Sequence, residues 1–209
     1  MTIIFIVFII FILLYSIILH ELAHGWVAYK LGDSTPKLAG RLTFNPLAHI
    51  DLIGTIILPI FLLIISKGNI ALGFAKPVPI NPYNFKNPKK DVMWTGVAGP
   101  LANILLALFF ILLIKLDINS SFLYMIFSYG IFINLLLAIF NLLPIPPLDG
   151  SKVVASFLTP RGAYLYLKSE IIGIIAIFIL IYSGFLQWFI FPIIKSIFYL
   201  VGIRFDLFE

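Results

Sequence analysis

The chain contains no cysteine and few charged residues. Among its 209 residues there is no cysteine, 11% are charged and 62% are hydrophobic. Without cysteine, disulfides and thiolate metal ligands are excluded, so any metal must be held by histidine or carboxylate. The small share of charge and the mean hydropathy of +1.13 exclude an ordinary soluble domain. The composition therefore predicts a multi-pass integral membrane protein in contact with the lipid bilayer.

Long polar stretches are also missing. No segment offers a separate extramembrane module, so we expect a single domain over residues 1–209, with a core at about 1–158 and C-terminal helices at about 168–201. The formal net charge of +5 comes from basic residues beside apolar segments. Because these form no clustered basic stripe with interleaved aromatics, we expect no nucleic-acid partner.

Apolar runs divide the chain and predict its fold class. They indicate an all-α polytopic membrane protein with about five to six transmembrane helices. Between the second and third runs, glycines and prolines are too dense for a helix, and residues 70–80 predict a membrane-associated β-hairpin or re-entrant segment. The runs are residues 2–31, 52–65, 96–114, 121–143, 171–185 and 188–201.

The first run contains a metal-binding motif. Residues 20–24 read His20-Glu21-Leu22-Ala23-His24. Positions i and i+4 share one helix face, so two imidazoles there can bind one metal ion. Zinc lowers the pKa of a bound water molecule towards neutrality, and Glu21 beside it can act as general base. A catalytic zinc usually has three protein ligands, so the pattern predicts one Zn²⁺ per chain and a third ligand from elsewhere.

Asp149 is the main candidate for that third ligand. It follows a proline-rich break at residues 144–147, at the end of an apolar run, where a carboxylate can point inward. Most other acidic residues lie in connections or near the C-terminus. The alternative for Asp149 is an N-cap for a helix that starts at Gly150 or Ser151, since aspartate before a helix binds its free N–H groups.

Five patches in order extend this pattern. They read HELAHG at 20–25, GRLTFNP at 40–46 leading to HID at 49–51, GFAKPVP at 73–79, AGPLAN at 98–103 and NLLPIPPLDG at 141–150. On these patches the chain resembles the site-2 protease family of intramembrane zinc metalloproteases, in its compact form without a PDZ or CBS domain. The last sixty residues match nothing as specific.

The resemblance implies an activity and a site. By resemblance, the protein is a zinc metalloendopeptidase of a prokaryotic cell membrane, which hydrolyses a peptide bond in or near a transmembrane segment of a membrane-anchored protein. His20, His24 and Asp149 are then the zinc ligands, and Glu21 is the general base.

Substrate contacts are a further implication of the resemblance. Asn141 corresponds to the family's helical asparagine, and Gly73, Phe74 and Ala75 belong to its membrane-embedded hairpin. An edge of this hairpin could pair with an unwound substrate, although the segment could instead be a structural plug. For Asn141, and for Asn103 on the preceding apolar run, inter-helix hydrogen bonding is the ordinary alternative.

Basic residues predict the orientation. If the metal ligands meet, the first and fourth apolar runs end on the same side of the membrane. The last two runs are then expected to cross the membrane and cross back, which puts Arg204 on that side too. Because basic residues crowd the cytosolic side, we expect the N-terminus outside and the metal towards the cytosolic leaflet. Only Lys115 clearly falls opposite. The ten residues assigned to the crowded side, of fourteen in all, are Lys30, Lys37, Arg41, Lys86, Lys89, Lys90, Lys152, Arg161, Lys168 and Arg204.

Two other function classes fit part of the pattern. Buried histidines and carboxylates also mark the ion pathway of a metal-ion transporter. A transporter should distribute polar groups across the bilayer and tolerate loss of Glu21, whereas the groups here cluster at one depth. A proteolytically inactive scaffold would not need the intact motif.

Overall fold

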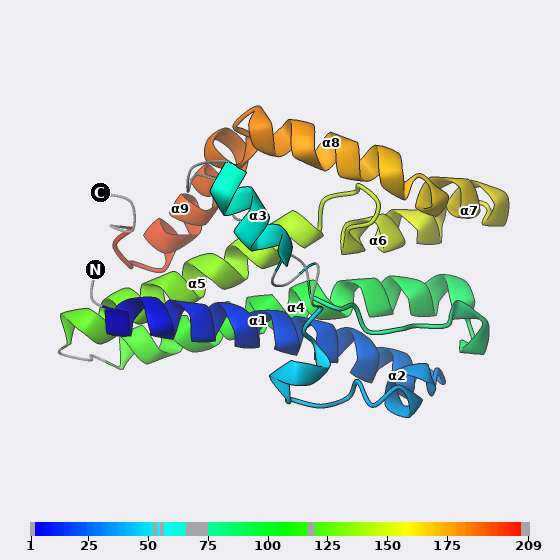
Figure 1. Ribbon diagram of the computed structural model, residues 1–209, viewed down its shortest axis with the longest axis horizontal. Coiled ribbons are helices and arrows are strands. Elements are labelled where there is room, and N and C mark those ends of the chain that lie inside the picture. The colour runs from blue at the N-terminus through cyan, green and yellow to red at the C-terminus, as the bar shows by residue number, and fades with distance from the viewer. Residues whose placement is uncertain (1–2, 52–53, 55–56, 66–74, 117–119, 206–209) are drawn as a thin grey trace.

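The computed structural model describes residues 3–51, 54, 57–65, 75–116 and 120–205, which form helices and connections with no β-strand (Figure 1). Short turns of 3₁₀-helix lie at Pro46–Ala48 and Pro82–Asn84, and a π-helical turn lies at Leu186–Ile190. The α-helices are α1 (Ile3–Lys30), α2 (Thr35–Leu38), α3 (Leu58–Ile65), α4 (Pro88–Lys115), α5 (Ser121–Asn141), α6 (Asp149–Phe157), α7 (Pro160–Lys168), α8 (Glu170–Tyr182) and α9 (Phe191–Leu200).

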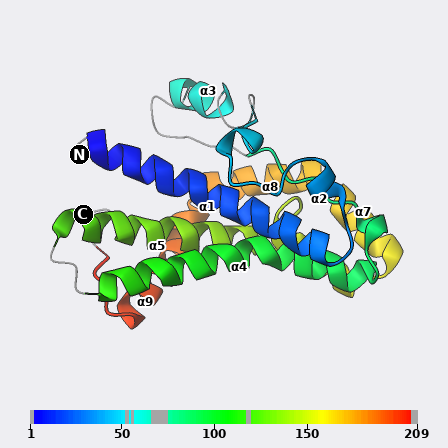
Figure 2. The ribbon, with the colours of Figure 1, turned by 90° about the horizontal axis from the view of Figure 1, so that it is seen from below.

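Three long helices, α1, α4 and α5, lie side by side and form the body of the protein (Figures 1 and 2). Their inner faces bury apolar side chains such as Ile12, Ala107 and Ile131. Many large apolar side chains on their outer faces are exposed, as expected where lipid replaces water as the solvent. Gly130 lets α5 approach α4 closely, because a Cβ there would lie 2.7 Å from the Phe110 ring.

The structure does not support five to six membrane spans. In the described residues, α1, α4 and α5 are long and apolar enough to cross a bilayer, and the pair α7 and α8, bent by 55°, makes up to four. In the described part of the run at 52–65, α3 has eight residues, and the last apolar helix, Leu186–Leu200, consists of a π-helical turn and the ten-residue α9. At 1.5 Å per residue these helices are shorter than a bilayer core of about 30 Å.

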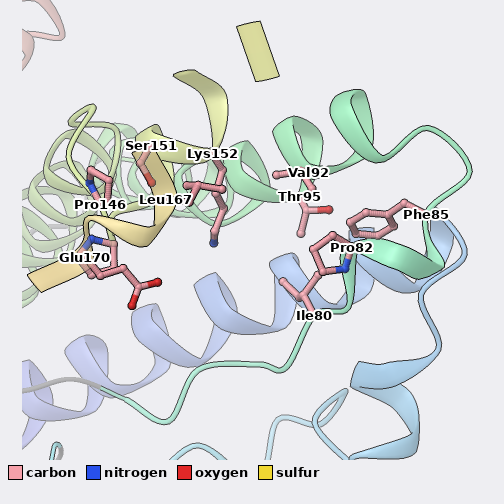
Figure 3. A pocket seen from close by; sticks show the side chains of 11 residues that line it. Ile80, Pro82, Phe85, Val92, Thr95, Pro146, Ser151, Lys152, Leu167 and Glu170 are labelled. Atoms are coloured by element: carbon pink, nitrogen blue, oxygen red, sulfur yellow. The ribbon is translucent and has the colours of Figure 1, made fainter. Parts of the chain in front are cut away.

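The expected hairpin at 70–80 is not supported either. Residues 70–74, including Gly73 and Phe74, lie outside the described residues, and residues 75–80 form no strand. Pro77 and Pro79 lack the N–H groups that a strand ladder needs. The described part of this segment is instead an extended connection that runs beside α1 towards the start of α4 (Figure 3).

The C-terminal helices follow a different path from the expected one. The last two apolar runs were expected to cross in opposite directions and bring Arg204 back to the metal end. Instead, α8 leads from the α7 end of the molecule towards the end that carries the N-terminus, and α9 does not cross back (Figure 1). The Arg204 N–H donates to the Tyr124 hydroxyl at 2.8 Å, and a Cβ at Gly202 would lie 3.5 Å from Lys115 Nζ. Arg204 therefore lies at the Lys115 end, and nine of the ten assigned basic residues remain at the opposite end.

Asp33 connects the end of α1 to the chain before α4. Its buried carboxylate accepts hydrogen bonds from the Asn81 N–H at 2.7 Å, the Asn84 side-chain amide at 2.8 Å and the Thr35 N–H at 3.0 Å. Burial by itself raises the pKa of a carboxyl, but these bonds and the Thr35 hydroxyl outweigh it and hold the pKa of Asp33 below its usual value. The ionised form is therefore part of the folded structure.

Candidate metal centre

His20, His24 and Asp149 meet between the helices. The two histidines lie four residues apart on α1, and Asp149 is the first residue of α6. Asp149 Oδ2 lies 3.0 Å from Nε2 of each histidine, and the two Nε2 atoms lie 3.1 Å apart. All three side chains are buried, with relative exposures of 7%, 4% and 6%. Residues separated by more than 120 positions thus bring three potential ligand atoms to one point.

Asp149 does not cap its helix. The N-cap of α6 is Leu148, and the Asp149 carboxylate turns to the histidines and to Lys152. Lys152 Nζ donates to Oδ1 at 2.7 Å, which leaves Oδ2 facing the imidazoles. Gly150 permits the tight turn, since a Cβ there would lie 2.2 Å from the Leu142 carbonyl oxygen. Sequence alone left the N-cap role open, and the geometry instead favours a ligand role.

The tautomer of His24 follows from its partner. His24 Nδ1 lies 2.6 Å from the Thr95 backbone carbonyl, which can only accept a hydrogen bond. Nδ1 must therefore carry a proton. In the neutral ring, Nε2 then presents a lone pair to the point where the three side chains meet.

A buried polar chain, the hydrogen-bonded side chains of Asn134 and Asn103, fixes the tautomer of His20 in the same way. The Gly130 carbonyl accepts from Asn134 Nδ2 at 2.9 Å, so Asn134 presents Oδ1 to Asn103 Nδ2, also at 2.9 Å. Asn103 Nδ2 also donates to the Ser16 carbonyl at 3.3 Å. This leaves Asn103 Oδ1 to accept from His20 Nδ1 at 2.6 Å. Two backbone carbonyls thus orient both amides, and His20, like His24, presents an Nε2 lone pair.

This donor set fits a divalent metal ion such as zinc. When both rings are neutral, two imidazole nitrogens and a carboxylate oxygen converge through their lone pairs, and a cation bound between them removes their mutual repulsion. Holding the outer ring nitrogen with a carbonyl or amide oxygen is the usual way a protein orients a metal-binding histidine. Gly99 allows α4 to pack directly against the two imidazole rings, because a Cβ there would lie 2.3 Å from His24 Nε2 and 2.6 Å from His20 Nε2.

A cavity of about 520 Å³ opens in front of these groups. Glu21, Ala75 and Asn141 lie in its wall together with the three candidate ligands. Glu21 Oε2 accepts the Val78 N–H at 3.0 Å, which ties the base candidate to the extended segment. Asn141 Nδ2 donates to the Leu137 carbonyl of its own helix at 2.9 Å. Of the predicted substrate-contacting residues, Asn141 and Ala75 therefore border the cavity.

Arg41 holds the extended segment in place. Its buried guanidinium donates to the carbonyls of Ala48, Lys76 and Pro77, the last at 3.2 Å. The Lys76 N–H in turn donates to the His49 carbonyl at 3.0 Å. The N–H groups of Lys76 and Val78 and the carbonyls of Lys76 and Pro77 are thus hydrogen-bonded within the protein, and this part of the segment forms a wall of the cavity.

The sequence reasoning found the three candidate ligands but missed the residues that support them. The structure confirms inter-helix hydrogen bonding by Asn103, yet its contact with His20 was not foreseen. Asn134, Arg41 and Lys152 were not singled out for a site role. An asparagine within an apolar run and a lysine three residues after the aspartate were the available signals.

Comparison with known proteins places these features in a family. A family model described as "Peptidase family M50" matches residues 117–184. "Putative zinc metalloprotease YwhC" of Bacillus subtilis (strain 168) is 37% identical over 193 residues, which cover 88% of this chain and 84% of that protein. "Zinc metalloprotease MJ0392" of Methanocaldococcus jannaschii is 28% identical over 200 residues, or 93% of this chain and 48% of that protein. No solved structure matches the chain.

Proposed function

The chain belongs to peptidase family M50, the site-2 proteases, and is a zinc metalloprotease, and from this premise we propose that it cleaves within the membrane. Its substrate is a transmembrane or otherwise membrane-anchored protein, and the cleaved bond lies in or near the transmembrane segment. The main support is the position of the three candidate ligands, which lie buried against α4, one of the three long apolar helices.

His20, His24 and Asp149 would hold one zinc ion per chain. When bound there, zinc supplies an electrophile that polarises a peptide carbonyl and acidifies water. The chain's own contribution is to keep both Nε2 atoms unprotonated, through Asn103 Oδ1 on one ring and the Thr95 carbonyl on the other. Lys152 contributes by fixing which oxygen of Asp149 faces the imidazoles.

Glu21 is the proposed general base. It follows His20 directly, lines the same cavity, and has one carboxylate oxygen, Oε2, held by the Val78 N–H at 3.0 Å. This bond orients the carboxylate, so Oε1 is the oxygen that takes a proton from the attacking water and returns it to the leaving nitrogen. Loss of the Glu21 carboxylate should therefore abolish hydrolysis without removing a metal ligand.

The substrate must unwind before it can react. A helix in lipid hides its carbonyls in its own hydrogen bonds, so an extended stretch of substrate has to enter the cavity. Asn141 and four residues of the extended segment line this cavity, the four being Ala75, Pro77, Val78 and Ile80. Since the N–H groups of Lys76 and Val78 and the carbonyls of Lys76 and Pro77 are already hydrogen-bonded, we propose that this segment confines the extended substrate chiefly by contact.

We also propose an orientation in a prokaryotic cell membrane and a single functional domain over residues 1–209. Nine basic residues at the metal end, against Lys115, Lys195 on α9 and Arg204 at the other, favour a cytosolic location for the metal end and an external N-terminus. All the groups of the proposed metal site and its cavity come from residues 16–152.

The test is cleavage of a single-span model substrate by purified, zinc-loaded protein, with the Glu21→Gln variant alongside and bound zinc counted in both. We expect cleavage by the parent alone and one zinc ion per chain in both proteins. Folded protein that binds no zinc would refute the site. Equal cleavage by the variant would refute the role of Glu21.

A further inference from the structure

A second pocket, of about 200 Å³, adjoins the metal cavity (Figure 3). Ile80, Pro147 and Lys152 line both spaces. Lys152 Nζ also bonds to Asp149 Oδ1 at 2.7 Å. A single lysine side chain therefore connects the wall of this pocket to a proposed metal ligand. Beyond it, Phe85 and Val92 form one side of the pocket and Leu167 another (Figure 3).

The chemistry of the pocket suits an apolar occupant. Most of its lining is apolar, and its buried hydroxyls already have partners. The Thr95 hydroxyl donates to the Asp91 carbonyl at 2.7 Å, and the Ser151 hydroxyl donates to the Leu148 carbonyl at 2.6 Å. Neither group needs a hydrogen bond from a ligand. Glu170, the remaining charged residue of the lining, is exposed.

The size and position of the pocket suit one side chain close to the scissile bond. Pockets that enclose whole small-molecule ligands measure about 300–1,000 Å³, so about 200 Å³ holds less. An extended peptide advances about 3.3 Å per residue, so the length of a lysine side chain corresponds to about two residues. A substrate chain that leaves the metal cavity past Lys152 would bring its next side chains to this pocket.

We propose that this pocket binds one large apolar side chain of the substrate, within about two residues of the scissile bond on the side that leads towards the start of α4. The pocket thereby selects where in a membrane segment the cut falls. This inference rests on the proposed intramembrane proteolysis and adds a preference that zinc chemistry alone does not impose.

The absence of cysteine allows a direct proximity test. In a Glu21→Gln background, Leu167→Cys introduces the only thiol of the chain. A substrate with a single cysteine, moved through the positions on both sides of the cut, is bound and oxidised, and disulfide-linked complex is measured on a gel. We expect linkage to concentrate at one position, or at two positions two residues apart. Tyr83→Cys, at a side chain 94% exposed on the neighbouring turn, is the control and should show no such peak.

A kinetic test in the active chain complements the linkage. Val92→Trp should fill the pocket, so we expect the preference for leucine over alanine at the linked position to fall at least tenfold in kcat/KM. Preferences at other positions should stay the same. An equal loss for all substrates, or linkage independent of position, would overturn the pocket.

The outcomes separate this inference from the proposed function. Cleavage by the parent with position-independent linkage refutes the pocket alone. Concentrated linkage without cleavage by the parent supports the pocket and refutes proteolysis. If neither cleavage nor linkage occurs with any substrate, both are refuted.

Discussion

Replacing Asn103 by leucine should weaken zinc binding although Asn103 is not a proposed ligand. Asn103 is fully buried, and its Oδ1 accepts the proton of His20 Nδ1 at 2.6 Å. Leucine has a similar volume but cannot accept a hydrogen bond, so the variant leaves the Nδ1–H of His20 without its partner.

Loss of this hydrogen bond destabilises mainly the zinc-loaded protein. Without zinc, the His20 ring can move its proton to Nε2, where Asp149 Oδ2 lies 3.0 Å away to accept it. With zinc, Nε2 binds the metal, so the proton must stay on Nδ1, where it is buried without a hydrogen-bond acceptor. An unsatisfied buried donor costs about 1–3 kcal/mol. Loss of a partner to a metal-binding histidine usually costs about 10- to 100-fold in metal affinity, which is about 1.4–2.7 kcal/mol and agrees with that range.

The assay is competition for zinc between a chelator and purified protein in detergent, for the parent and for Asn103→Leu. Leu105→Ala, a change at a side chain 58% exposed on the same helix, is the matched control and should keep the parental affinity. Thermal unfolding of the zinc-free proteins reports whether each variant is folded. A folded Asn103→Leu variant with unchanged zinc affinity would refute the role assigned to the polar chain.

Three further predictions test other contacts of the site. Gly99→Ala should prevent zinc binding in protein that still folds, because its Cβ would lie 2.3 Å from His24 Nε2; zinc counted in purified protein checks this. Arg41→Met should lower kcat more than it raises KM, because residues 75–80 and the Glu21 carboxylate lose their support; Arg41→Lys should restore part of kcat. Because the pKa of Asp33 is lowered by folding, its ionised form stabilises the protein above the unfolded pKa of about 3.9, and this stability is lost as the pH falls through the lower folded pKa. Chemical unfolding across acidic pH should show a smaller loss of stability in Asp33→Asn than in the parent.

Local sequence patterns predicted the parts of the molecule that depend on local physics. The spacing of His20 and His24 required one helix face, and uninterrupted apolar runs predicted α1, α5 and most of α4, which begins at Pro88, eight residues before its run. Asp149 could be proposed because an acidic residue after a proline break at the end of an apolar run is unusual. Each of these inferences needed fewer than about thirty neighbouring residues.

The missed features depend on long-range packing. The amide orientation of Asn103 follows from the Ser16 carbonyl on α1 and from Asn134 on α5, and no local pattern reveals these contacts. The side expected for Arg204 was wrong because the last apolar run, which contains Pro192, was counted as a complete crossing, whereas the structure divides it between a π-helical turn and the ten-residue α9. An apolar run predicts burial in lipid or protein, but its length decides whether it can span.

The charges around the site explain why an amide rather than a carboxylate supports His20. In a formal count with neutral imidazoles, ionised Asp149 and Glu21 and charged Lys152, the site without zinc has one net negative charge. A zinc dication reverses this to one net positive charge. Isolated buried charge is costly, and it is costlier still between membrane helices. A carboxylate in place of Asn103 would satisfy His20 Nδ1 equally well, but it would double the net negative charge of the zinc-free site. The neutral amide provides the same orientation and keeps the site within one charge of neutrality both with and without the metal.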